Sequence, residues 1–349
     1  MTHPTVLWEI TRACALECTQ CPKPDDGGRP GSQELSTYEA YKTVDQIGSL
    51  APRQFIITGG DPLARPDLLQ IIDYAKRRGL KPAVALSATP NLTPQAIDAL
   101  RANGATTLIF ALNGSSPLRH DVVSGIPGAF RKTLEAIHAA IDAEIPVEID
   151  TLITRRNVSD INAIADLLAG LSIEAWNVHF VVPVGNARKL EILTAEEAER
   201  VFEVLATVQR NNRFRVRSVE APEYRRYLLQ NQTDAQWADF ATDCPEEVAD
   251  CSIDDVVFIG ANGAVRPSEF LPIAAGNVRF RPLFGIVRGS DLFVAFRDRG
   301  NLTGKCARCE FKEVCGGSRA RAWAMTGLLF GPDPLCAYQP KRTLQEATS

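Results

Sequence analysis

The chain has 349 residues, of which 45% are hydrophobic and 23% charged, enough apolar material for one large domain or two. Its net charge is −4 and its basic residues are scattered, so it carries no electrostatic footprint for nucleic acid or an anionic membrane. Residues 1–4 show no leader pattern, and no run approaches the roughly 20 apolar residues of a membrane helix. We therefore expect a globular cytoplasmic protein with neither nucleic acid nor membrane as a partner.

Short apolar, β-branched runs alternate with helical patterns between residues 5 and 185. Strands are predicted at 5–10, 54–58, 82–89, 107–113, 147–153 and 176–182. Helices are predicted at 36–50, 68–78, 93–103, 129–144 and 159–169, the first opened by a capping pattern of Ser36 and Glu39. Six strands separated by helices indicate an α/β fold with a parallel sheet and right-handed crossovers. Six such units are too few for a complete eight-stranded barrel.

Polar and glycine residues follow each predicted strand. In parallel α/β folds the chemistry lies at the carboxyl ends of the strands, so these residues predict one shared site. They are Cys14 onward, Gly59-Gly60-Asp61, Ser87 with Thr89 and Asn91, Asn113 with Ser115, Asp150 with Thr151, and Pro183 with Gly185.

Seven of the nine cysteines fall into two tight groups, which in a cytosolic chain indicates metal binding rather than disulfides. The groups are Cys14, Cys18 and Cys21, and Cys306, Cys309, Cys315 and Cys336; Cys244 and Cys251 lie between them. Three closely spaced thiolates can hold three corners of a [4Fe–4S] cube and leave the fourth iron without a protein ligand. The first group therefore predicts an iron that is open to a substrate or a cofactor.

These features together resemble the radical S-adenosylmethionine (SAM) enzymes, whose fold is a partial (β/α)6 barrel of the triose-isomerase type. The resemblance rests on the CxxxCxxC loop, the glycine pair after the second strand and the repeat of strands and helices. The C-terminal cysteine group resembles the SPASM or twitch extension, which carries auxiliary iron–sulfur clusters. Residues 58–63, 87–90, 182–185 and 315–322 resemble the branch that includes haem-pathway decarboxylases and related small-molecule enzymes.

The resemblance implies that Cys14, Cys18 and Cys21 bind a [4Fe–4S] cluster whose open iron is chelated by SAM. An external reductant such as flavodoxin or ferredoxin then drives cleavage of SAM to a 5′-deoxyadenosyl radical, which abstracts a substrate hydrogen. The alternative for these cysteines is a zinc loop, but the motif lacks an adjacent fourth ligand.

Further cofactor contacts are implied at the strand ends. The candidates are Gly59, Gly60 and Asp61, which replaces the family's usual Glu, together with Ser87, Thr89, Asn113 and Asp150. The glycines alternatively serve a strand–helix turn, and the polar residues alternatively cap helices. Arg155 is a candidate catalytic residue that could pair with a substrate carboxylate, or it is a solvated arginine beside Arg156.

The C-terminal cysteines imply one auxiliary [4Fe–4S] cluster with four protein ligands. Ser268 and Arg319 stand where the extension has ligands of a further cluster, so we expect that cluster to be missing. Cys251 is then a relic of it and Cys244 an ordinary thiol. A zinc site with four cysteine ligands is the alternative.

The segment between the cysteine groups gives a weaker signal. A helix is predicted at 194–211, a cover for the barrel mouth at 220–227 and a β-hairpin at 256–266. Residues 267–271 are predicted to point into the mouth, where Glu269 either defines the substrate as a catalytic residue or is merely solvated. The predicted regions are the barrel at 1–215, a bridging segment at 216–305 and the auxiliary cluster region at 306–349.

For the reaction, the residues favour a small-molecule substrate, because no room for a peptide-binding module precedes Cys14. The haem-branch resemblance and scattered arginines at 155, 225, 226, 319 and 321 favour a carboxylated one. We therefore predict decarboxylation of a tetrapyrrole propionate or a sugar acid. The alternatives are a maturase that makes a thioether or carbon–carbon crosslink in a ribosomally made peptide, and a non-catalytic iron–sulfur or zinc protein.

Overall fold

The computed structural model describes residues 3–21, 33–231 and 256–341. Cys244 and Cys251 lie outside these residues. The strands are β1 Thr5–Glu9, β2 Gln54–Thr58, β3 Pro82–Leu86, β4 Thr107–Ala111, β5 Val147–Ile153, β6 Ala175–Phe180, β7 Arg215–Val219, β8 Val256–Ile259, β9 Ala264–Arg266 and β10 Gly276–Asn277.

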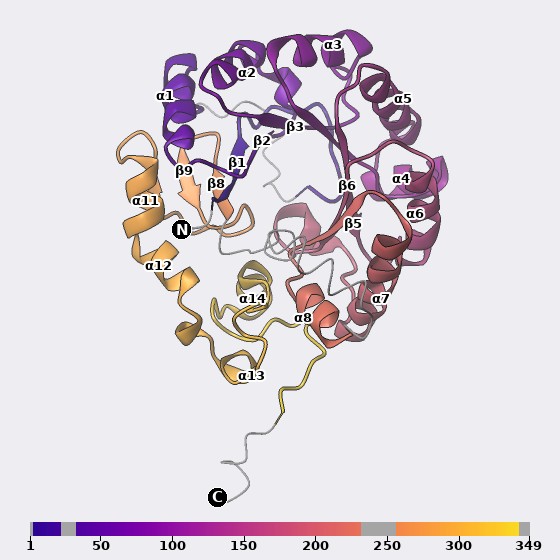
Figure 1. Cartoon of the computed structure of the whole chain (residues 1–349), viewed down its shortest axis with the longest axis vertical. Coiled ribbons are helices and arrows are strands. Elements are labelled where there is room, and N and C mark those ends of the chain that lie inside the picture. The colour runs from indigo at the N-terminus through magenta and orange to yellow at the C-terminus, as the bar shows by residue number, and fades with distance from the viewer. Residues whose placement is uncertain (1–2, 22–32, 232–255, 342–349) are drawn as a thin grey trace, which may run out of the picture.

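The ten strands form one sheet in the order β10-β9-β8-β1-β2-β3-β4-β5-β6-β7. Neighbours from β1 to β7 are parallel, as are β8 and β1, whereas β8, β9 and β10 pair antiparallel. The sheet curves into an incomplete barrel with helices around its outside (Figure 1). Parallel pairing with outer helices confirms the predicted partial barrel.

The helices are α1 Thr37–Gly48, α2 Leu68–Arg77, α3 Pro94–Asn103, α4 Pro117–Ser124, α5 Ala129–Asp142, α6 Ile161–Ala169, α7 Ala195–Asn211, α8 Glu223–Gln230, α11 Leu283–Gly289, α12 Asp291–Arg297, α13 Gly304–Ala307 and α14 Arg319–Thr326. The capping box of Ser36 and Glu39 opens α1 as predicted, and Thr194 and Glu197 form a second one at α7. No helix of the described ranges is long and apolar enough to cross a membrane.

All six predicted strands are present, and the structure adds a seventh parallel strand, β7, which the sequence analysis missed. Three of its five residues are arginine or serine, so it lacks the apolar run that marked the other strands. The predicted hairpin is confirmed as β8 and β9, with Gly263 at a φ of 81° in the turn. The three predicted regions stay a prediction: β7 crosses the boundary at 215, and β8 to β10 continue the barrel sheet.

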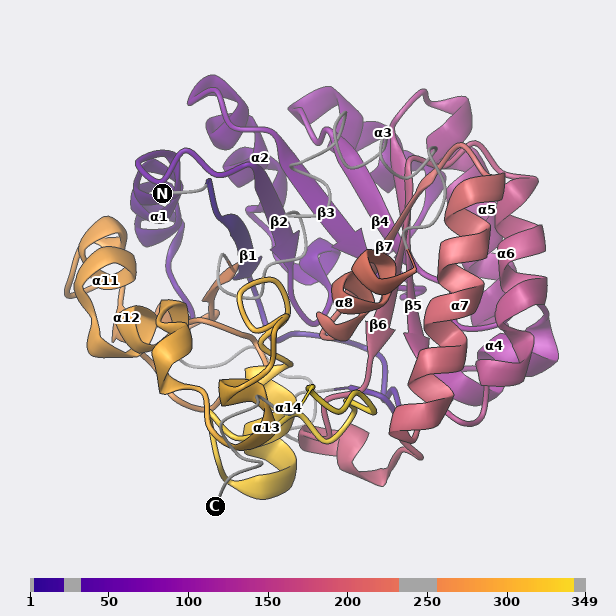
Figure 2. The ribbon, with the colours of Figure 1, turned by 60° about the horizontal axis from the view of Figure 1, so that its bottom comes forward.

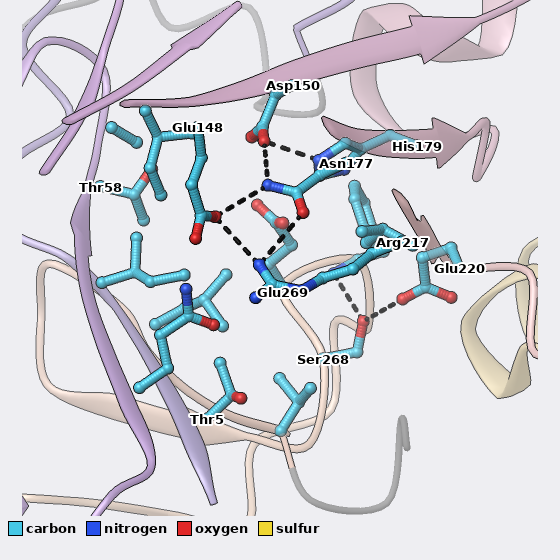
Figure 3. Close-up of a pocket in the computed structure, with 18 of the residues that line it drawn as sticks. Thr5, Thr58, Glu148, Asp150, Asn177, His179, Arg217, Glu220, Ser268 and Glu269 are labelled. Carbon is cyan, nitrogen blue, oxygen red and sulfur yellow. Dashed lines mark hydrogen bonds and ion pairs between the residues drawn. The ribbon is translucent and has the colours of Figure 1, made fainter. Parts of the chain in front are cut away.

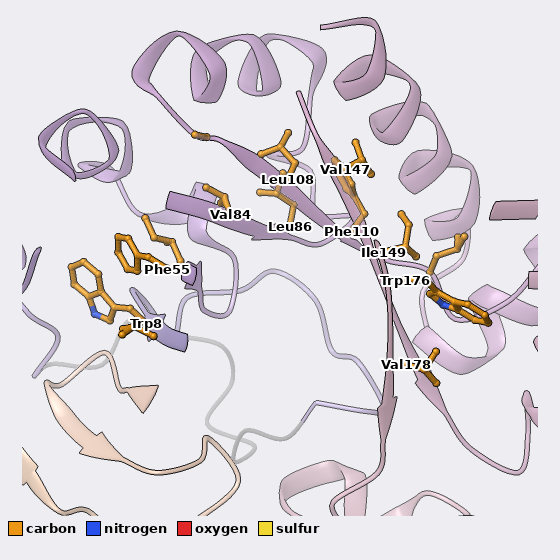
Figure 4. Packing of buried hydrophobic residues seen from close by; sticks show 14 of the residues in the cluster. Trp8, Phe55, Val84, Leu86, Leu108, Phe110, Val147, Ile149, Trp176 and Val178 are labelled. Carbon is orange, nitrogen blue, oxygen red and sulfur yellow. The ribbon is translucent and has the colours of Figure 1, made fainter. Parts of the chain in front are cut away.

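The core lies between the sheet and the helices because side chains alternate along each strand. Trp8 and Phe55 stack there with ring centroids 6.5 Å apart, and Trp176 is fully buried farther along the sheet (Figure 4). Intervening residues such as Leu7 and Ile56 face the barrel lumen instead. The same alternation therefore builds the core on one face and the walls of a cavity on the other.

The C-terminal segment lies across the open side of the barrel, between its two sheet edges. Figures 1 and 2 show α13 and α14 beside α8, below the curved sheet. A hydrophobic cluster of Val182, Leu271, Phe296 and Ala320 joins the end of β6 to this segment. The extension thereby brings residues of the 267–271 loop to the lumen.

Candidate functional site

The glycine pair after β2 packs directly on the start of the first cysteine loop. A Cβ at Gly59 would lie 2.7 Å from the carbonyl oxygen of Thr11, and one at Gly60 would lie 2.4 Å from that of Ala13. Backbone N–H groups use this close approach: Gly60 donates to Thr11 at 2.8 Å, and Asp61 donates to Ala13 at 2.7 Å. The glycines are therefore required by the contact between two loops, which fixes the position of the cysteine loop.

The side chain of Asp61 is fully buried and accepts three hydrogen bonds. Its carboxylate receives the Leu63 backbone N–H at 3.0 Å, the Thr89 hydroxyl at 2.7 Å and the Asn91 amide at 2.8 Å. Asp61 and Thr89 thus join the ends of β2 and β3 to each other. Their contact with SAM stays a prediction, and the observed bonds give both side chains a structural task.

Asn113 also organises strand ends. Its side-chain oxygen accepts the backbone N–H of Leu152 at 2.7 Å, while its backbone carbonyl accepts the amide of Asn157 at 2.9 Å. Ser87 is half-buried just after β3. Cofactor contacts of Ser87 and Asn113, like those of Gly59 and Gly60, remain predictions.

The first cysteine group places three thiols close to one another. Cys14, Cys18 and Cys21 are half-buried and form no disulfide. Burial, with added repulsion from Cys14 and Cys21, raises the pKa of Cys18 to about 12. The three thiols are therefore close enough to interact, and iron binding would remove their protons. This set fits a [4Fe–4S] cluster with one iron that has no cysteine ligand.

The second cysteine group lines one small cavity at the extension. Cys306, Cys309, Cys315 and Cys336 face it, and each has a pKa raised chiefly by burial, in Cys336 to about 12. Glu223 also faces this cavity. Four converging thiols supply the donor set of a closed cluster, so these residues fit the predicted auxiliary centre.

Within residues 3–21, 33–231 and 256–341, no three His, Cys, Asp or Glu side chains surround one point as ligands of a single ion would. Metal content distinguishes iron from zinc at either cysteine group.

A cavity of about 190 Å³ occupies the barrel lumen (Figure 3). Its β1–β4 wall carries no charged side chain from within the strands and consists of Thr5, Leu7, Gln54, Ile56, Thr58, Ala85 and Ile109. Its β5–β7 wall is polar and consists of Glu148, Asp150, Asn177, His179, Arg217, Ser218 and Val219. Arg53, Glu220, Val256 and residues 267–270 complete the lining.

The polar wall is a ladder across three adjacent strands. Asp150 on β5 pairs in register with Asn177 on β6, which pairs with Arg217 on β7. The Asn177 amide donates to Asp150 at 2.9 Å and to Glu148 at 3.1 Å (Figure 3). Arg217 donates to the same Glu148 oxygen at 3.1 Å. Paired residues point to one side of a sheet, which is why these side chains meet.

His179 lies one step farther along β6, with its Nε2 atom 3.2 Å from Oδ2 of Asp150. Burial lowers the pKa of His179, but Asp150, and then Glu269 and Glu220, raise it above the usual value. The imidazole is thus biased toward its charged form in the cavity wall.

Glu220 connects the cavity to the auxiliary region. Its carboxylate accepts the hydroxyls of Ser268, at 3.2 Å, and of Ser318. Its backbone has a φ of 57°, the left-handed region, and Arg321 donates to its carbonyl at 2.7 Å. Arg321 also forms a fork with Asp333, with distances of 2.9 and 2.8 Å. These buried bonds hold the cavity wall against the segment that carries Cys315 and Cys336.

Asp150, a predicted cofactor contact, and the two predicted catalytic residues, Glu269 and Arg155, divide between the cavity and the surface. Asp150 and Glu269 line the cavity, and residues 267–270 enter it as expected. Arg155 does not: it is exposed and pairs with Glu197 of α7 at 2.8 Å. A catalytic role for Arg155 therefore stays a prediction, and the observed ion pair gives this side chain a structural task outside the cavity lining.

The other arginines that suggested a carboxylated substrate are also outside the cavity lining. Arg226 pairs with Glu199, Arg321 pairs with Asp333, and Arg319 donates to backbone carbonyls. Arg225 donates to the carbonyl of Val314. These four hold the extension to the barrel, so they no longer support that argument.

Sequence reasoning missed most of the polar wall: Glu148, Asn177, His179, Arg217 and Glu220. A usable signal was present, because Glu148 and Asp150, and likewise Asn177 and His179, are two residues apart within buried strands. Charged residues repeating with a period of two indicate one polar face. Arg217 could not be placed on this face because its strand, β7, was not predicted.

The fold, the cysteine loop and the glycine turn define a class of enzyme. A model of the radical SAM superfamily matches residues 8–168. The chain belongs to this family, because a relative that matches nearly its whole length belongs to it as well. Enzymes of this family use a [4Fe–4S] cluster and SAM. That relative is an AdoMet-dependent heme synthase from Methanosarcina barkeri, 32% identical and covering 96% of each chain.

Less similar relatives have different names. An Fe-coproporphyrin III synthase from Methanosarcina barkeri is 26% identical over 95% of this chain and 87% of its own. A PqqA peptide cyclase from Rhodopseudomonas palustris is 26% identical over 96% of this chain and 87% of its own. Among solved structures, Streptococcus suis SuiB bound to S-adenosylmethionine has a TM-score of 0.75 at 13% identity, covering 96% of this chain and 77% of that one. The last comparison shows the shared fold.

Proposed function

We propose that this radical SAM enzyme acts on a tetrapyrrole and removes carbon dioxide from a propionate arm. The observation that carries the proposal is the 32% identity to an AdoMet-dependent heme synthase, which extends over 96% of both chains and so includes the cysteine extension. The lumen adds support, because it offers a short cavity with a partly buried arginine, Arg217, in one wall.

The residues of the chain would share the work as follows. Cys14, Cys18 and Cys21 would hold the cluster that, with SAM, supplies a 5′-deoxyadenosyl radical when bound. The loop from Gly59 and Gly60 would hold SAM beside them. The lumen would exclude water and orient the substrate arm.

The cysteines of the extension would hold one auxiliary cluster. Removal of a hydrogen atom from the arm, followed by loss of carbon dioxide and one electron, would leave a vinyl group. When bound by these cysteines, the cluster would supply an acceptor for that electron, and flavodoxin or ferredoxin would serve as the external reductant.

Anaerobic turnover tests the proposal. Reconstituted enzyme with dithionite, SAM and iron coproporphyrin III should give 5′-deoxyadenosine, carbon dioxide and a product lighter by the mass of formic acid for each vinyl group formed. A Cys18→Ala variant should give none of these. Deoxyadenosine without loss of carbon dioxide from any tetrapyrrole carboxylate would refute the decarboxylation and leave the family assignment in place.

A further inference from the structure

We propose that Arg217 anchors the carboxylate of one short substrate arm inside the lumen, while the rest of the substrate stays outside it. The inference rests on the proposed function and specifies how its substrate is held. It starts from the unlike walls of the cavity, one of them free of charged side chains along β1–β4 and the other a polar ladder along β5–β7. A hydrocarbon arm that ends in a carboxylate matches both walls.

The size of the lumen limits what can enter. Cavities for drug-sized ligands measure about 300–1,000 Å³, whereas this one measures about 190 Å³. A tetrapyrrole ring is at least drug-sized, so the lumen takes a side arm and leaves the ring at the mouth. The mouth is marked by Glu220 and Ser268, which meet at the carboxyl end of β7 (Figure 3).

Arg217 is held ready in the polar wall. Its side chain is 14% exposed. Its guanidinium lies 3.1 Å from the Glu148 carboxylate and donates to the side-chain oxygen Oδ1 of Asn177 at 3.4 Å. Apolar residues of similar volume often stabilise a fold as well as a buried ion pair does. Packing of the barrel therefore gives no reason for a charge pair in this wall, whereas carboxylate binding does, because the guanidinium fork matches a carboxylate.

The second arginine of the lining lies at the other end of the barrel. Arg53 comes just before β2 and donates to the Thr5 hydroxyl at 3.1 Å. Arg53 and Thr5 are at the amino ends of β2 and β1, away from the mouth. Arg217 is the arginine that an arm entering from the carboxyl ends meets first.

The charges of the lining permit an anion. The carboxylates of Glu148, Asp150 and Glu269 face Arg53, Arg217 and an imidazole, His179, that Asp150 biases toward its cation. The fourth carboxylate, Glu220, has a pKa raised by burial and accepts two serine hydroxyls. The lining therefore holds two guanidinium groups and an imidazole that can face one added carboxylate, while the Glu220 carboxylate is already occupied by serine hydroxyls.

This arrangement also orients the arm. The wall along β1–β4 belongs to the strands that lead to the first cysteine loop and to Gly59 and Gly60. With the carboxylate on Arg217, the carbon atoms of the arm lie against that wall. The hydrogen that is removed is then one carried by the arm, between the ring and the carboxylate.

Binding of two small probes tests the anchor independently of turnover. The probes are 3-(1H-pyrrol-3-yl)propanoate and its primary amide, titrated calorimetrically into anaerobic holoenzyme with S-adenosylhomocysteine. The acid should bind the wild type at least tenfold more tightly than the amide does. Arg217→Gln should weaken the acid at least tenfold and abolish this preference. Arg78→Gln, which removes an exposed arginine paired with Asp45, is the matched control and should bind like the wild type.

Loss of Arg217 leaves Glu148 without its buried partner, so a second variant, Glu148→Gln with Arg217→Gln, keeps a neutral hydrogen-bonded pair. Circular dichroism and the melting temperature establish that each variant is folded. Equal affinity of the acid for wild type and both Arg217 variants, equal binding of acid and amide, or failure of the acid to bind the wild type each overturns the anchor.

Turnover separates the anchor from the proposed function. Iron coproporphyrin III should show a raised KM with Arg217→Gln and a wild-type KM with Arg78→Gln. Acid binding that depends on Arg217, with no tetrapyrrole carboxylate consumed, supports the anchor and refutes the proposed function. Conversion with an unchanged KM in the variant refutes the anchor and supports the function.

Discussion

Gly60→Ala should displace the first cysteine loop, because the added methyl group has no space. It would lie 2.4 Å from the carbonyl oxygen of Ala13 and 2.6 Å from that of Arg12. Both atoms belong to the backbone, so no side-chain rotation can relieve the clash. The cysteine loop must move away by several tenths of an ångström or more, which also strains the hydrogen bonds from Gly60 to Thr11 and from Asp61 to Ala13.

Overpacking of this kind costs about 1–3 kcal/mol of unfolding free energy. For a large domain that corresponds to a fall of roughly 2–8 °C in the melting temperature. The larger effect should be on cluster assembly, because the displaced backbone leads directly to Cys14. We expect iron content to fall toward the amount held by the C-terminal cysteines, with loss of SAM cleavage.

The assay combines thermal unfolding, iron and sulfide content, and SAM cleavage after anaerobic reconstitution. Gly48→Ala is the matched control, since a Cβ at that helix position meets nothing within 4 Å. It should bind iron and cleave SAM like the wild type. Wild-type melting and iron content in Gly60→Ala would refute the packing argument for the glycine turn.

Three further predictions concern buried charges and the second cysteine group. Asp333→Asn removes the buried partner of Arg321 and should lower the unfolding free energy by about 3–5 kcal/mol, measured by urea titration. Asp150→Asn should lower the pKa of His179, measured by NMR titration of the imidazole. Because the pKa of His179 is raised in the folded protein, its protonation stabilises the fold below about pH 6.5. This stabilisation is lost as the pH rises through the pKa of His179 in the folded state. Cys336→Ser should remove about four of about eight irons per chain.

Each of these has an outcome that would contradict it. Arg78→Gln breaks an exposed pair with Asp45 and should cost at most about 1 kcal/mol, so an equal loss for Asp333→Asn would contradict the role of burial. An unchanged pKa of His179 in Asp150→Asn would show that Asp150 does not raise the pKa of this imidazole. Bound zinc at the C-terminal cysteines, with iron unaffected by Cys336→Ser, would contradict the auxiliary cluster.

Prediction from the sequence succeeded where a local pattern reports a local structure. The six apolar strands and the capping box of Ser36 follow from periodicity and capping chemistry, and both are confirmed. It missed β7, where Arg217 lines the lumen and no apolar run marks the strand. It also gave no sign of the ion pair between Arg155 and Glu197, which lies 42 residues away. Burial of a charge depends on contacts that are distant in the sequence.

The sequence by itself determined the class of enzyme. The cysteine motif of Cys14, Cys18 and Cys21 and the pair Gly59-Gly60 are each short motifs of neighbouring residues. A metal loop and a tight turn are set by neighbouring residues, so a linear motif carries them. Tertiary structure alone decided which charges share the cavity. Asp150, Asn177 and Arg217 meet only through the register of three parallel strands. Ser268 and Glu220, which are 48 residues apart in the sequence, complete the cavity lining through their hydrogen bond. The side chains that line the cavity are far apart in the sequence and come together only on folding.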